Sequence, residues 1–316
     1  MQPEQRARIV EEQTTRHDAG DAARPTVSAV IISCNDAEVI EPCLRSVIGW
    51  VDDIVVVDMH STDGTREIAL RYTDRLLDHD RLTYADPARD FAFAQATSEW
   101  IMMLDPDERV TEQLARELRR IATIADVDVV LIPRQDVDFG RAVTSPGTAD
   151  IAHPRFFRRG VMSWPTGVHE HPDLTGLRCR SLPGDRPELA LLHEAWRSVP
   201  LVLDRMLRYA PREVEKLQAR GEHFSPQTMF GAMWQQVERR MVNGRAYEDG
   251  MPGLLVVLYW CVYFLTVHAE LWEAQGRTAE FDRQIGRWGR RLARIYRVGL
   301  RASRLGQRIA RVGRRG

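Results

Sequence analysis

The sequence predicts an α/β fold built on a mostly parallel sheet, followed by a helical C-terminal region. Short apolar runs rich in β-branched residues, typical of buried parallel strands, alternate with segments of helical periodicity. Polar turns separate the two kinds of segment, as expected when helices connect parallel strands. The 316 residues are 44% hydrophobic, which is enough for a sizeable core in one large domain with an appendage or in two small domains.

The alternation of strands and helices extends over residues 25–135. The expected strands are the apolar runs at residues 27–32, 54–57, 100–104 and 129–132. The expected helices lie at residues 39–48, from Thr65 onward, at 91–97, and at 112–122 behind a Thr111 cap. Beyond residue 135 the pattern weakens, with a segment rich in Pro, Gly, Arg and His at 136–192 and helical periodicity again at 200–245.

A strongly apolar run of fourteen residues lies at 254–267. A helix that spans a bilayer needs about 20 such residues. The run therefore predicts a buried helix, with a helix at a membrane interface as the alternative.

Composition and charge divide the chain into a leader at residues 1–24, an α/β domain at 25–198, a helical region at 199–282 and a basic tail at 283–316. The leader is predicted to be disordered and lacks the apolar segment of a secretory signal. Four cysteines without CxxC spacing favour free thiols in a reducing compartment. These features predict a cytoplasmic protein.

The tail holds twelve arginines and no acidic residue. Of the chain's 44 basic and 45 acidic residues, 32 and 45 then remain for residues 1–282, a charge of −13. A basic tail on an acidic body suits an anionic membrane surface or a nucleic acid, whereas a helix with a solvated arginine face is the simpler alternative.

Four Asp-X-Asp pairs occur in the chain: Asp78/Asp80, Asp105/Asp107, Asp126/Asp128 and Asp136/Asp138. Only Asp105/Asp107 directly follows a buried run, at the carboxyl end of the expected strand 100–104. Two carboxylates on such a turn can hold Mg²⁺ or Mn²⁺ and leave positions open for phosphate oxygens. The alternative is a loop that caps the following helix.

Polar residues follow three of the expected strands, namely Asn35, Asp58 and the Asp105/Asp107 pair. In open α/β sheets, ligands bind beyond the carboxyl ends of the strands. The sequence therefore predicts a ligand site at this edge of the sheet.

Several segments together resemble a known family. Residues 28–69 (SAVIISCNDAEVIEPCLRSVIGWVDDIVVVDMHSTDGTREIA) and 88–110 (ARDFAFAQATSEWIMMLDPDERV) resemble the inverting glycosyltransferases of family 2. The branch is that of the lipopolysaccharide-core β-glucosyltransferases, which HPRFFRRGVMSWPTGVHEHP, LLHEAW and RYAPREVEKLQARG also resemble. The similarity covers roughly residues 27–270. It implies a GT-A-type, Rossmann-like fold and hexosyl transfer from a UDP-sugar-like donor to an acceptor hydroxyl, with inversion and a divalent metal.

The resemblance also implies donor-binding residues. Asp58 would bind a uracil-type base, with Asn35 lining the same pocket and Asp63 in the same loop. Arg89 would face the diphosphate or the ribose, and Asp105 the ribose or the metal. A turn-forming aspartate and a surface ion pair remain the alternatives for Asp58 and Arg89.

Catalytic and metal-binding roles follow from the same resemblance. Asp107 would be the main metal ligand, and Glu170 the general base that takes the proton of the acceptor hydroxyl. His169 or His193 would be a further metal or phosphate contact. Glu170 as a structural carboxylate and the histidines as ordinary hydrogen-bonded residues remain open.

The chain departs from the family pattern at three places. Asp36 replaces a glutamate, Met59-His60 replaces Ser-Gly in the nucleotide loop, and Asp90 replaces an asparagine. The last two lie in the expected donor pocket, so they bear on which nucleotide and sugar the chain would use.

Three other classes of protein are weaker interpretations. A haloacid-dehalogenase-like phosphatase would carry its aspartates at the first strand, with Thr or Val where this chain has Arg109. A non-catalytic sugar-nucleotide or lipid-binding module is the main alternative, although the metal pair is present. A nucleic-acid-binding protein is disfavoured by the −13 body, so no nucleic acid is expected. The expected partners are a nucleotide-sugar donor and a glycan or glycolipid acceptor of the cell envelope, with peripheral contact to an anionic inner membrane face.

Overall fold

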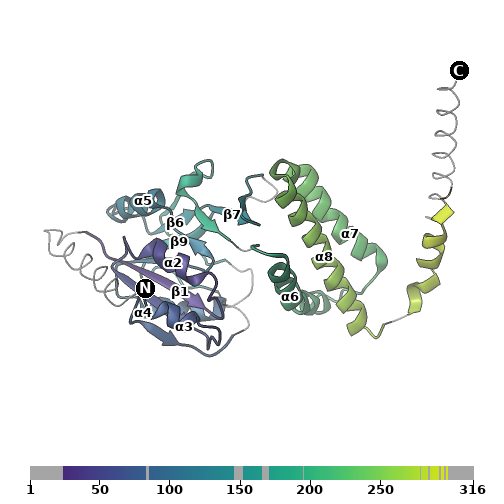
Figure 1. The fold of residues 1–316 in the computed structure, drawn as a ribbon, viewed down its shortest axis with the longest axis horizontal. Helices are drawn as coiled ribbons and strands as arrows, with labels where there is room; N and C mark the ends of the chain where they lie inside the picture. The colour runs from purple at the N-terminus through teal and green to yellow at the C-terminus, as the bar shows by residue number, and fades with distance from the viewer. Residues whose placement is uncertain are drawn as a thin grey trace, which may run out of the picture. The chain divides into compact units, whose positions relative to one another are not determined.

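The computed structural model describes residues 24–82, 85–145, 152–165, 171–194, 196–277, 279–283, 285–291, 293–294 and 297 (Figure 1). The predicted leader up to residue 23 and most of the basic tail lie outside these residues. The chain divides into two compact units. The first extends to Ser198 and includes Glu248–Gly253, and the second comprises Val199–Tyr247 and the chain from Leu254 onward.

A seven-stranded sheet forms the centre of the first unit. Its strands are β1 (Val27–Ser33), β2 (Asp53–Asp58), β3 (Leu76–Asp78), β4 (Trp100–Leu104), β6 (Val129–Ile132), β9 (His153–Arg158) and β10 (Cys179–Ser181). Their order is β10-β6-β9-β4-β1-β2-β3. Only β9 runs antiparallel to its neighbours in this described sheet. The predicted α/β fold with a mostly parallel sheet is confirmed.

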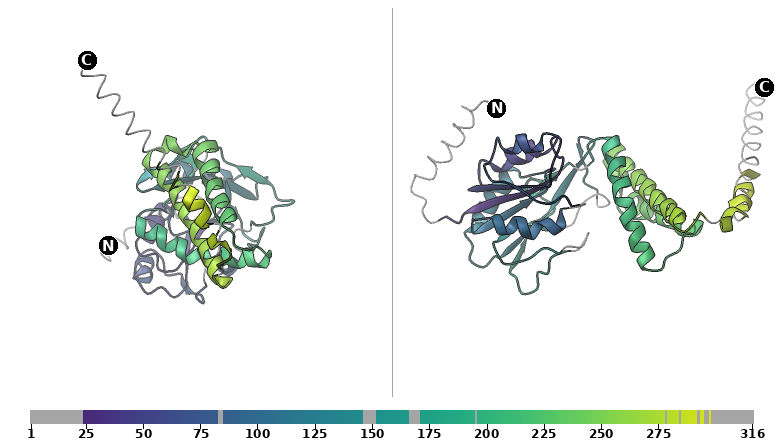
Figure 2. Two further views of the ribbon diagram at one scale, coloured as in Figure 1. Left: turned by 90° about the vertical axis from the view of Figure 1, so that its right-hand side faces the viewer. Right: turned by 90° about the horizontal axis from the view of Figure 1, so that it is seen from below.

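Both faces of this sheet are covered, which explains why its central strands are apolar along their whole length. Side chains of β1 alternate between two clusters, with Ala29 and Ile31 in one and Val30 and Ile32 in the other. The first cluster includes the buried faces of α2 (Ile40–Val47) and α5 (Glu112–Ala122). The second includes Phe93 of α4 (Arg89–Gln95), so helices lie on both faces of the sheet (Figure 2).

The predicted helices of the first unit are present with small shifts at their ends. The expected cap of α5 is confirmed, because the Thr111 hydroxyl accepts a hydrogen bond from the Leu114 amide at 3.0 Å. The helix expected from Thr65 is α3 (Thr65–Ala69), and Gly64 before it has a left-handed φ of 93°. The remaining short helices of this unit are 3₁₀ turns at Asp86–Ala88 and Pro187–Leu189.

A second, four-stranded sheet lies beside the first in the same unit, and the sequence did not predict it. Its order is β5-β11-β7-β8. Its strands are β5 (Glu108–Arg109), β7 (Arg134–Asp138), β8 (Arg141–Ala142) and β11 (Leu191–His193). Pairing of β11 with both β5 and β7 brings His193 opposite Glu108 on one side and Asp136 on the other.

The second unit is helical, as predicted. Its elements are α6 (Val199–Ala219), α7 (Pro226–Gln236), a π-helix (Val237–Asn243), α8 (Met251–Ala274, which begins in the first unit) and 3₁₀ turns at Ala246–Asp249 and Ala279–Phe281. A small core joins α6 to α8 through Ala210, Val214, Val267 and Leu271.

The prediction of a short buried helix at 254–267 is wrong. Helix α8 has 24 residues, and by length and composition it could cross a membrane. Only 28% of its apolar 18-residue stretch is buried. The apolar run is shorter than the helix, because the helix continues on both sides through less apolar residues.

Candidate functional site

The polar residues that follow three strands of the large sheet lie at one edge. Strands β4, β1 and β2 are adjacent and parallel, with Ile31 paired to Leu104 and Ser33 paired to Asp58. Their carboxyl ends therefore deliver Asn35, Asp58 and Asp105 to the same edge. The chain order reverses at β1, with β2 on one side and β4 on the other, and ligands bind at such a switch point in open α/β sheets.

The loops after β1 and β2 are tied together by hydrogen bonds. Asn35 has a left-handed φ of 59°, and its side-chain oxygen accepts a hydrogen bond from the Thr62 amide at 2.7 Å. The Asp63 carboxylate accepts hydrogen bonds from the Thr65 hydroxyl at 2.6 Å and from the Ala37 amide at 3.1 Å. Burial opposes ionisation of Asp63, but these hydrogen bonds outweigh it and lower its pKa. Asp63 thus links the loop after β2 to the loop after β1, which contains Asn35.

Asp58 is fully buried at the end of β2. One carboxylate oxygen accepts hydrogen bonds from the Ser61 amide at 3.0 Å and from Arg66 at 2.7 Å. The other oxygen has no hydrogen-bond partner among the described residues. A buried acceptor without a partner is costly, so this oxygen is suited to a water or a ligand N–H group.

Two of the three departures from the family pattern, Met59-His60 and Asp90, can be located in the structure. Met59 is buried in the core cluster of Val30 and Ile32, so its bulk lies within the core. His60, with a φ of 55°, is exposed. The Asp90 carboxylate accepts a hydrogen bond from the Trp164 amide at 2.7 Å and so anchors the strand-to-loop segment before residue 166.

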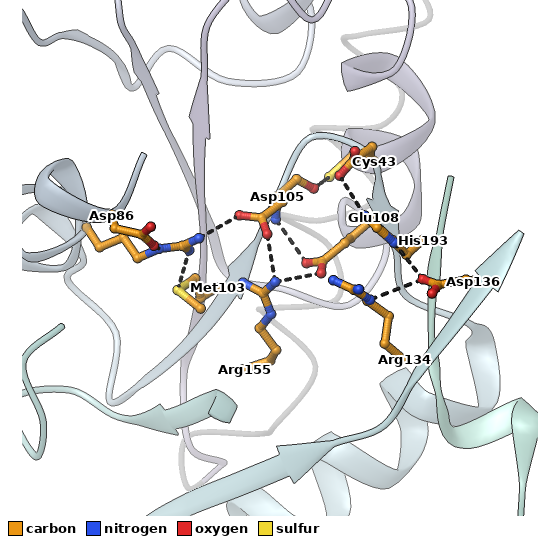
Figure 3. Close-up of polar contacts among 11 residues, drawn as sticks. Cys43, Asp86, Met103, Asp105, Glu108, Arg134, Asp136, Arg155 and His193 are labelled. Carbon is orange, nitrogen blue, oxygen red and sulfur yellow. Dashed lines mark hydrogen bonds and ion pairs between the residues drawn. The ribbon is translucent and has the colours of Figure 1, made fainter. Parts of the chain in front are cut away.

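Asp105 contacts Arg155 (Figure 3) and also Arg89. Its carboxylate accepts a hydrogen bond from Arg89 at 3.0 Å and one from Arg155 at 2.6 Å. Burial opposes the charge of Asp105, but Arg155 and then Arg89 outweigh it and hold its pKa well below the usual range. Asp105 is therefore an ionised carboxylate whose oxygens are already engaged by guanidinium groups.

Arg89, which the family resemblance implies as a diphosphate or ribose contact, is a buried side chain. Besides Asp105 it contacts Asp86 at 3.0 Å and the Met103 sulfur at 2.8 Å. Its guanidinium also lies 4.7 Å from the centre of the Trp164 ring, within range of a cation–π interaction. These contacts fix the orientation of Arg89 beside Asp105.

Sequence reasoning missed Glu108 and Arg155, which complete the cluster. Glu108 is fully buried, and its carboxylate accepts hydrogen bonds from Arg155 at 2.6 Å and from the Asp105 amide at 3.0 Å. Burial, together with the Asp105 charge, raises the pKa of Glu108 against the opposing effect of Arg155. One Arg155 nitrogen, Nη1, is buried without a partner in the described part of the chain. The available signal was an arginine between apolar residues in strand β9.

The structure brings Asp107 and His193 together. His193 Nε2 lies 3.7 Å from Asp107 Oδ1, and His193 Nδ1 donates a hydrogen bond to Asp136 Oδ1 at 2.7 Å. Asp136 also pairs with Arg134 at 3.2 Å. Burial opposes protonation of His193, but the Asp136 hydrogen bond and the Asp107 charge outweigh it and raise its pKa. Asp136, which sequence reasoning set aside, therefore holds His193.

Asp107 and His193 suit a divalent ion whose remaining ligands come from phosphate oxygens of a substrate. Within the described residues, no group of three or more His, Cys, Asp or Glu side chains is arranged to hold a metal. Mg²⁺ is commonly held by one or two carboxylates together with phosphate oxygens and waters. Asp107 and His193 offer such a partial set, whereas the Asp105 oxygens are engaged by arginines. The predicted His169 and Glu170 lie outside the described residues.

The structure is an α/β domain with a cluster of acidic residues at the carboxyl edge of its sheet. Residues 28–183 match the sequence profile of the family described as Glycosyl transferase family 2. This segment, about half of the chain, is a glycosyl transferase family 2 domain.

Curated relatives cover limited parts of the chain. An uncharacterized glycosyltransferase of Rickettsia felis is 34% identical over 95 residues, 30% of this chain and 33% of the relative. The SPbeta prophage-derived glycosyltransferase SunS of Bacillus subtilis is 28% identical over 159 residues, 47% of this chain and 35% of the relative. A TPR repeat-containing protein of Synechococcus elongatus is 39% identical over 98 residues, 31% of this chain and 24% of the relative. The chain thus spans about a quarter to a third of the length of these relatives.

Solved structures resemble the chain distantly. A mannosyltransferase from Pyrobaculum calidifontis in complex with GDP-Man and Mn²⁺ is 17% identical, covers 91% of this chain and 88% of its own, and has a TM-score of 0.44. Glucosyl-3-phosphoglycerate synthase from Mycobacterium tuberculosis in complex with Mg²⁺ and UDP is 19% identical, covers 40% and 47%, and has a TM-score of 0.31. Likeness at this level carries no inference about the chemistry of this chain.

Proposed function

We propose that this chain is a hexosyltransferase that moves a sugar from a UDP-sugar-like donor to an acceptor hydroxyl, with inversion at the anomeric carbon. One observation carries the proposal. In a family 2 domain, the ends of three adjacent parallel strands bring Asn35, Asp58 and Asp105 to the switch point of the sheet. The resemblance to lipopolysaccharide-core β-glucosyltransferases supports the inverting class.

The nucleotide is proposed to lie over β1 and β2. The unpartnered Asp58 oxygen would accept an N–H group of a uracil-type base, and Asn35 and Asp63 would shape the loop around it. Because that oxygen is buried, its use requires the loop after β2 to shift. Asp105, held by Arg89 and Arg155, is proposed to contact the ribose, and Arg89 to face the diphosphate.

Asp107 and His193 are proposed to hold Mg²⁺ or Mn²⁺ together with diphosphate oxygens. When bound, the cation stabilises the negative charge that builds on the leaving diphosphate, by several kcal/mol. The hydrogen bond from His193 Nδ1–H to Asp136 supports this assignment, because in the neutral ring it leaves Nε2, 3.7 Å from Asp107 Oδ1, free to bind a metal in place of a proton. Asp136 is therefore proposed as the positioning residue of His193.

Glu170, which lies outside the described residues, is proposed as the general base for the acceptor hydroxyl. In a single displacement, the acceptor oxygen bonds to the anomeric carbon, the bond from that carbon to the diphosphate oxygen breaks, and the hydroxyl proton passes to Glu170. General-base assistance contributes typically about 10²–10⁴-fold in rate. His169 is proposed as a phosphate or metal contact in the same segment.

The acceptor is proposed to be a glycolipid or polysaccharide precursor at the cytoplasmic face of the inner membrane. The basic tail at 283–316 supports a peripheral membrane location, because it is complementary to anionic lipids.

The experiment is a thermal-shift screen of nucleotide-sugars with Mn²⁺, followed by donor hydrolysis and transfer assays with the donor that stabilises the chain. Binding stabilises the folded state by RT ln(1 + [L]/Kd), so the correct donor should stand out. Asp107→Ala should abolish divalent-dependent turnover. Asp126→Ala, which removes an exposed carboxylate of a rival pair, is the matched control.

Wild-type turnover in Asp107→Ala, or full activity in EDTA, would contradict the metal assignment. A donor that binds with neither hydrolysis nor transfer to any acceptor would instead indicate the alternative, a non-catalytic sugar-nucleotide or lipid-binding module.

A further inference from the structure

Helix α8 exposes an apolar stripe along its length. Leu254, Leu258, Val262 and Leu265 recur every three or four residues and are 37–49% exposed. The opposite side of the helix is also apolar and packs inward, with Val267 and Leu271 against α6. A helix that is apolar all round belongs in a core or in lipid, because a water-facing side is ordinarily polar. The stripe therefore requires a partner that the described part of the chain does not supply.

The neighbouring helix α7 adds exposed aromatic side chains. Phe230 and Trp234 are 46% and 65% exposed. Helices α7 and α8 contact one another where the Cys261 thiol donates a hydrogen bond to the Met233 carbonyl at 3.5 Å. Large exposed apolar patches mark interaction sites, so we define the exposed side chains of α7 and α8 together as the apolar face.

Arginines lie near this apolar face at two places. The Trp288 ring lies 5.4 Å from the Phe230 ring, which brings the start of the basic segment to α7. The arginines of this segment that the structure describes are all exposed: Arg283, Arg287, Arg290, Arg291, Arg294 and Arg297. Arg240 lies 4.5 Å from the centre of the Trp260 ring on α8. Apolar side chains beside tryptophans and arginines are typical of elements that lie in a membrane interface.

We propose that the apolar face of α7 and α8 binds the surface of an anionic lipid bilayer, with the arginines of 283–297 on its headgroups. A bilayer with anionic lipids is favoured over a second copy of the chain, because residues 283–316 carry twelve arginines and no acidic residue and are complementary in charge to anionic headgroups. An interfacial position fits better than a spanning one, because one side of α8 is already packed against α6. The proposal concerns a partner of the second unit and does not depend on the transfer reaction.

The test is flotation of the full chain with vesicles of phosphatidylcholine alone or mixed with phosphatidylglycerol. The variant Leu258→Gln/Val262→Gln/Leu265→Gln removes the stripe at exposed positions, where the fold tolerates polar residues. Leu70→Gln, 47% exposed in the first unit, is the matched control. Each half-exposed apolar side chain is expected to contribute about fivefold to the partition coefficient, so the triple variant should partition roughly 100-fold more weakly onto the vesicles. Circular dichroism melts verify that it is folded.

The charge arm uses Arg287→Ala/Arg290→Ala. Each basic residue near an anionic surface contributes about fivefold, so this variant should partition roughly 25-fold less onto the mixed vesicles and be unchanged on phosphatidylcholine. Flotation of a folded triple variant equal to that of the wild type would overturn the proposal. So would a wild-type chain that ignores vesicles but forms a dimer by light scattering that the triple variant abolishes, since a second copy would then cover the face.

Discussion

Removing the Arg155 charge should destabilise the first unit more than any loss of surface contact. The substitution Arg155→Met keeps the apolar stem but removes the hydrogen bonds to Asp105 and Glu108, both at 2.6 Å. Glu108 is fully buried, so its carboxylate would be left without a cationic partner. Breaking a buried ion pair on one side costs about 3–5 kcal/mol. At about 2–4 °C per kcal/mol for a unit of this size, the Tm should fall by roughly 10 °C.

The assay is urea denaturation of four proteins: the wild type, Arg155→Met, Glu108→Gln and the double variant. Removing both charges leaves no buried Glu108 carboxylate without its cation, so the double variant should be more stable than Arg155→Met alone. Burial already raises the pKa of Glu108. Without Arg155, this carboxyl should therefore be protonated in the folded state at a higher pH than in the unfolded state. Stability contributed by a group with a raised pKa falls as the pH rises above the unfolded value of 4.5. The deficit of Arg155→Met should therefore be smaller at about pH 5 than at about pH 8.

Two results would refute this reasoning. The first is an unfolding free energy of Arg155→Met within about 1 kcal/mol of the wild type at both pH values. The second is a double variant whose loss equals the sum of the two single losses, because independent sites add and coupled charges do not.

Two further predictions concern strand β7. Asp136→Ala should lower Mn²⁺ affinity roughly 10–100-fold, measured by electron paramagnetic resonance of the free ion, because His193 loses the acceptor that orients it. Asp136→Asn should retain most of the affinity through its amide oxygen, and unchanged binding in Asp136→Ala would remove Asp136 from the positioning role. Burial and the Asp136 charge raise the pKa of Asp138 to about 7, so its contribution to stability is lost as the pH rises from 3.8 towards 7. Asp138→Asn should therefore be more stable than the wild type above about pH 7, by up to about 4 kcal/mol, and equal to it near about pH 4 in urea titrations. Equal stability at about pH 8 would count against the buried carboxyl as the cause.

Much of the large sheet was predictable because its information is local. A buried strand needs a short run of apolar, β-branched residues, and a helix needs a periodic apolar face, so strands β1, β2, β4 and β6 and the cap at Thr111 were correctly expected. Local pattern also separated Asp105/Asp107 from its rival pairs by its position after β4. It failed for α8, since a run of apolar letters does not mark where a helix begins or ends.

The small sheet was not predictable from local pattern, because its strands are short and polar. Asp136 was set aside since it follows the apolar run 129–132 only after three further residues. In the structure, β7 begins at Arg134 and carries Asp136 to its place opposite His193, 57 residues away. Short strands are stabilised mainly by pairing with segments that are distant in the chain, so the local sequence does not predict them.

By itself, the sequence determined the class of fold, the family and the strand ends at which polar residues gather, since these depend on apolar periodicity and short motifs. Tertiary structure alone decided how the acidic residues are used. It paired Asp105 with Arg89 and Arg155 and brought His193 between Asp107 and Asp136. Each of these pairs joins segments far apart in the chain, and a carboxylate beside two arginines differs in charge environment from one beside a histidine. That difference is why Asp107 with His193, rather than the Asp-X-Asp pair as a whole, is the set we propose for the metal.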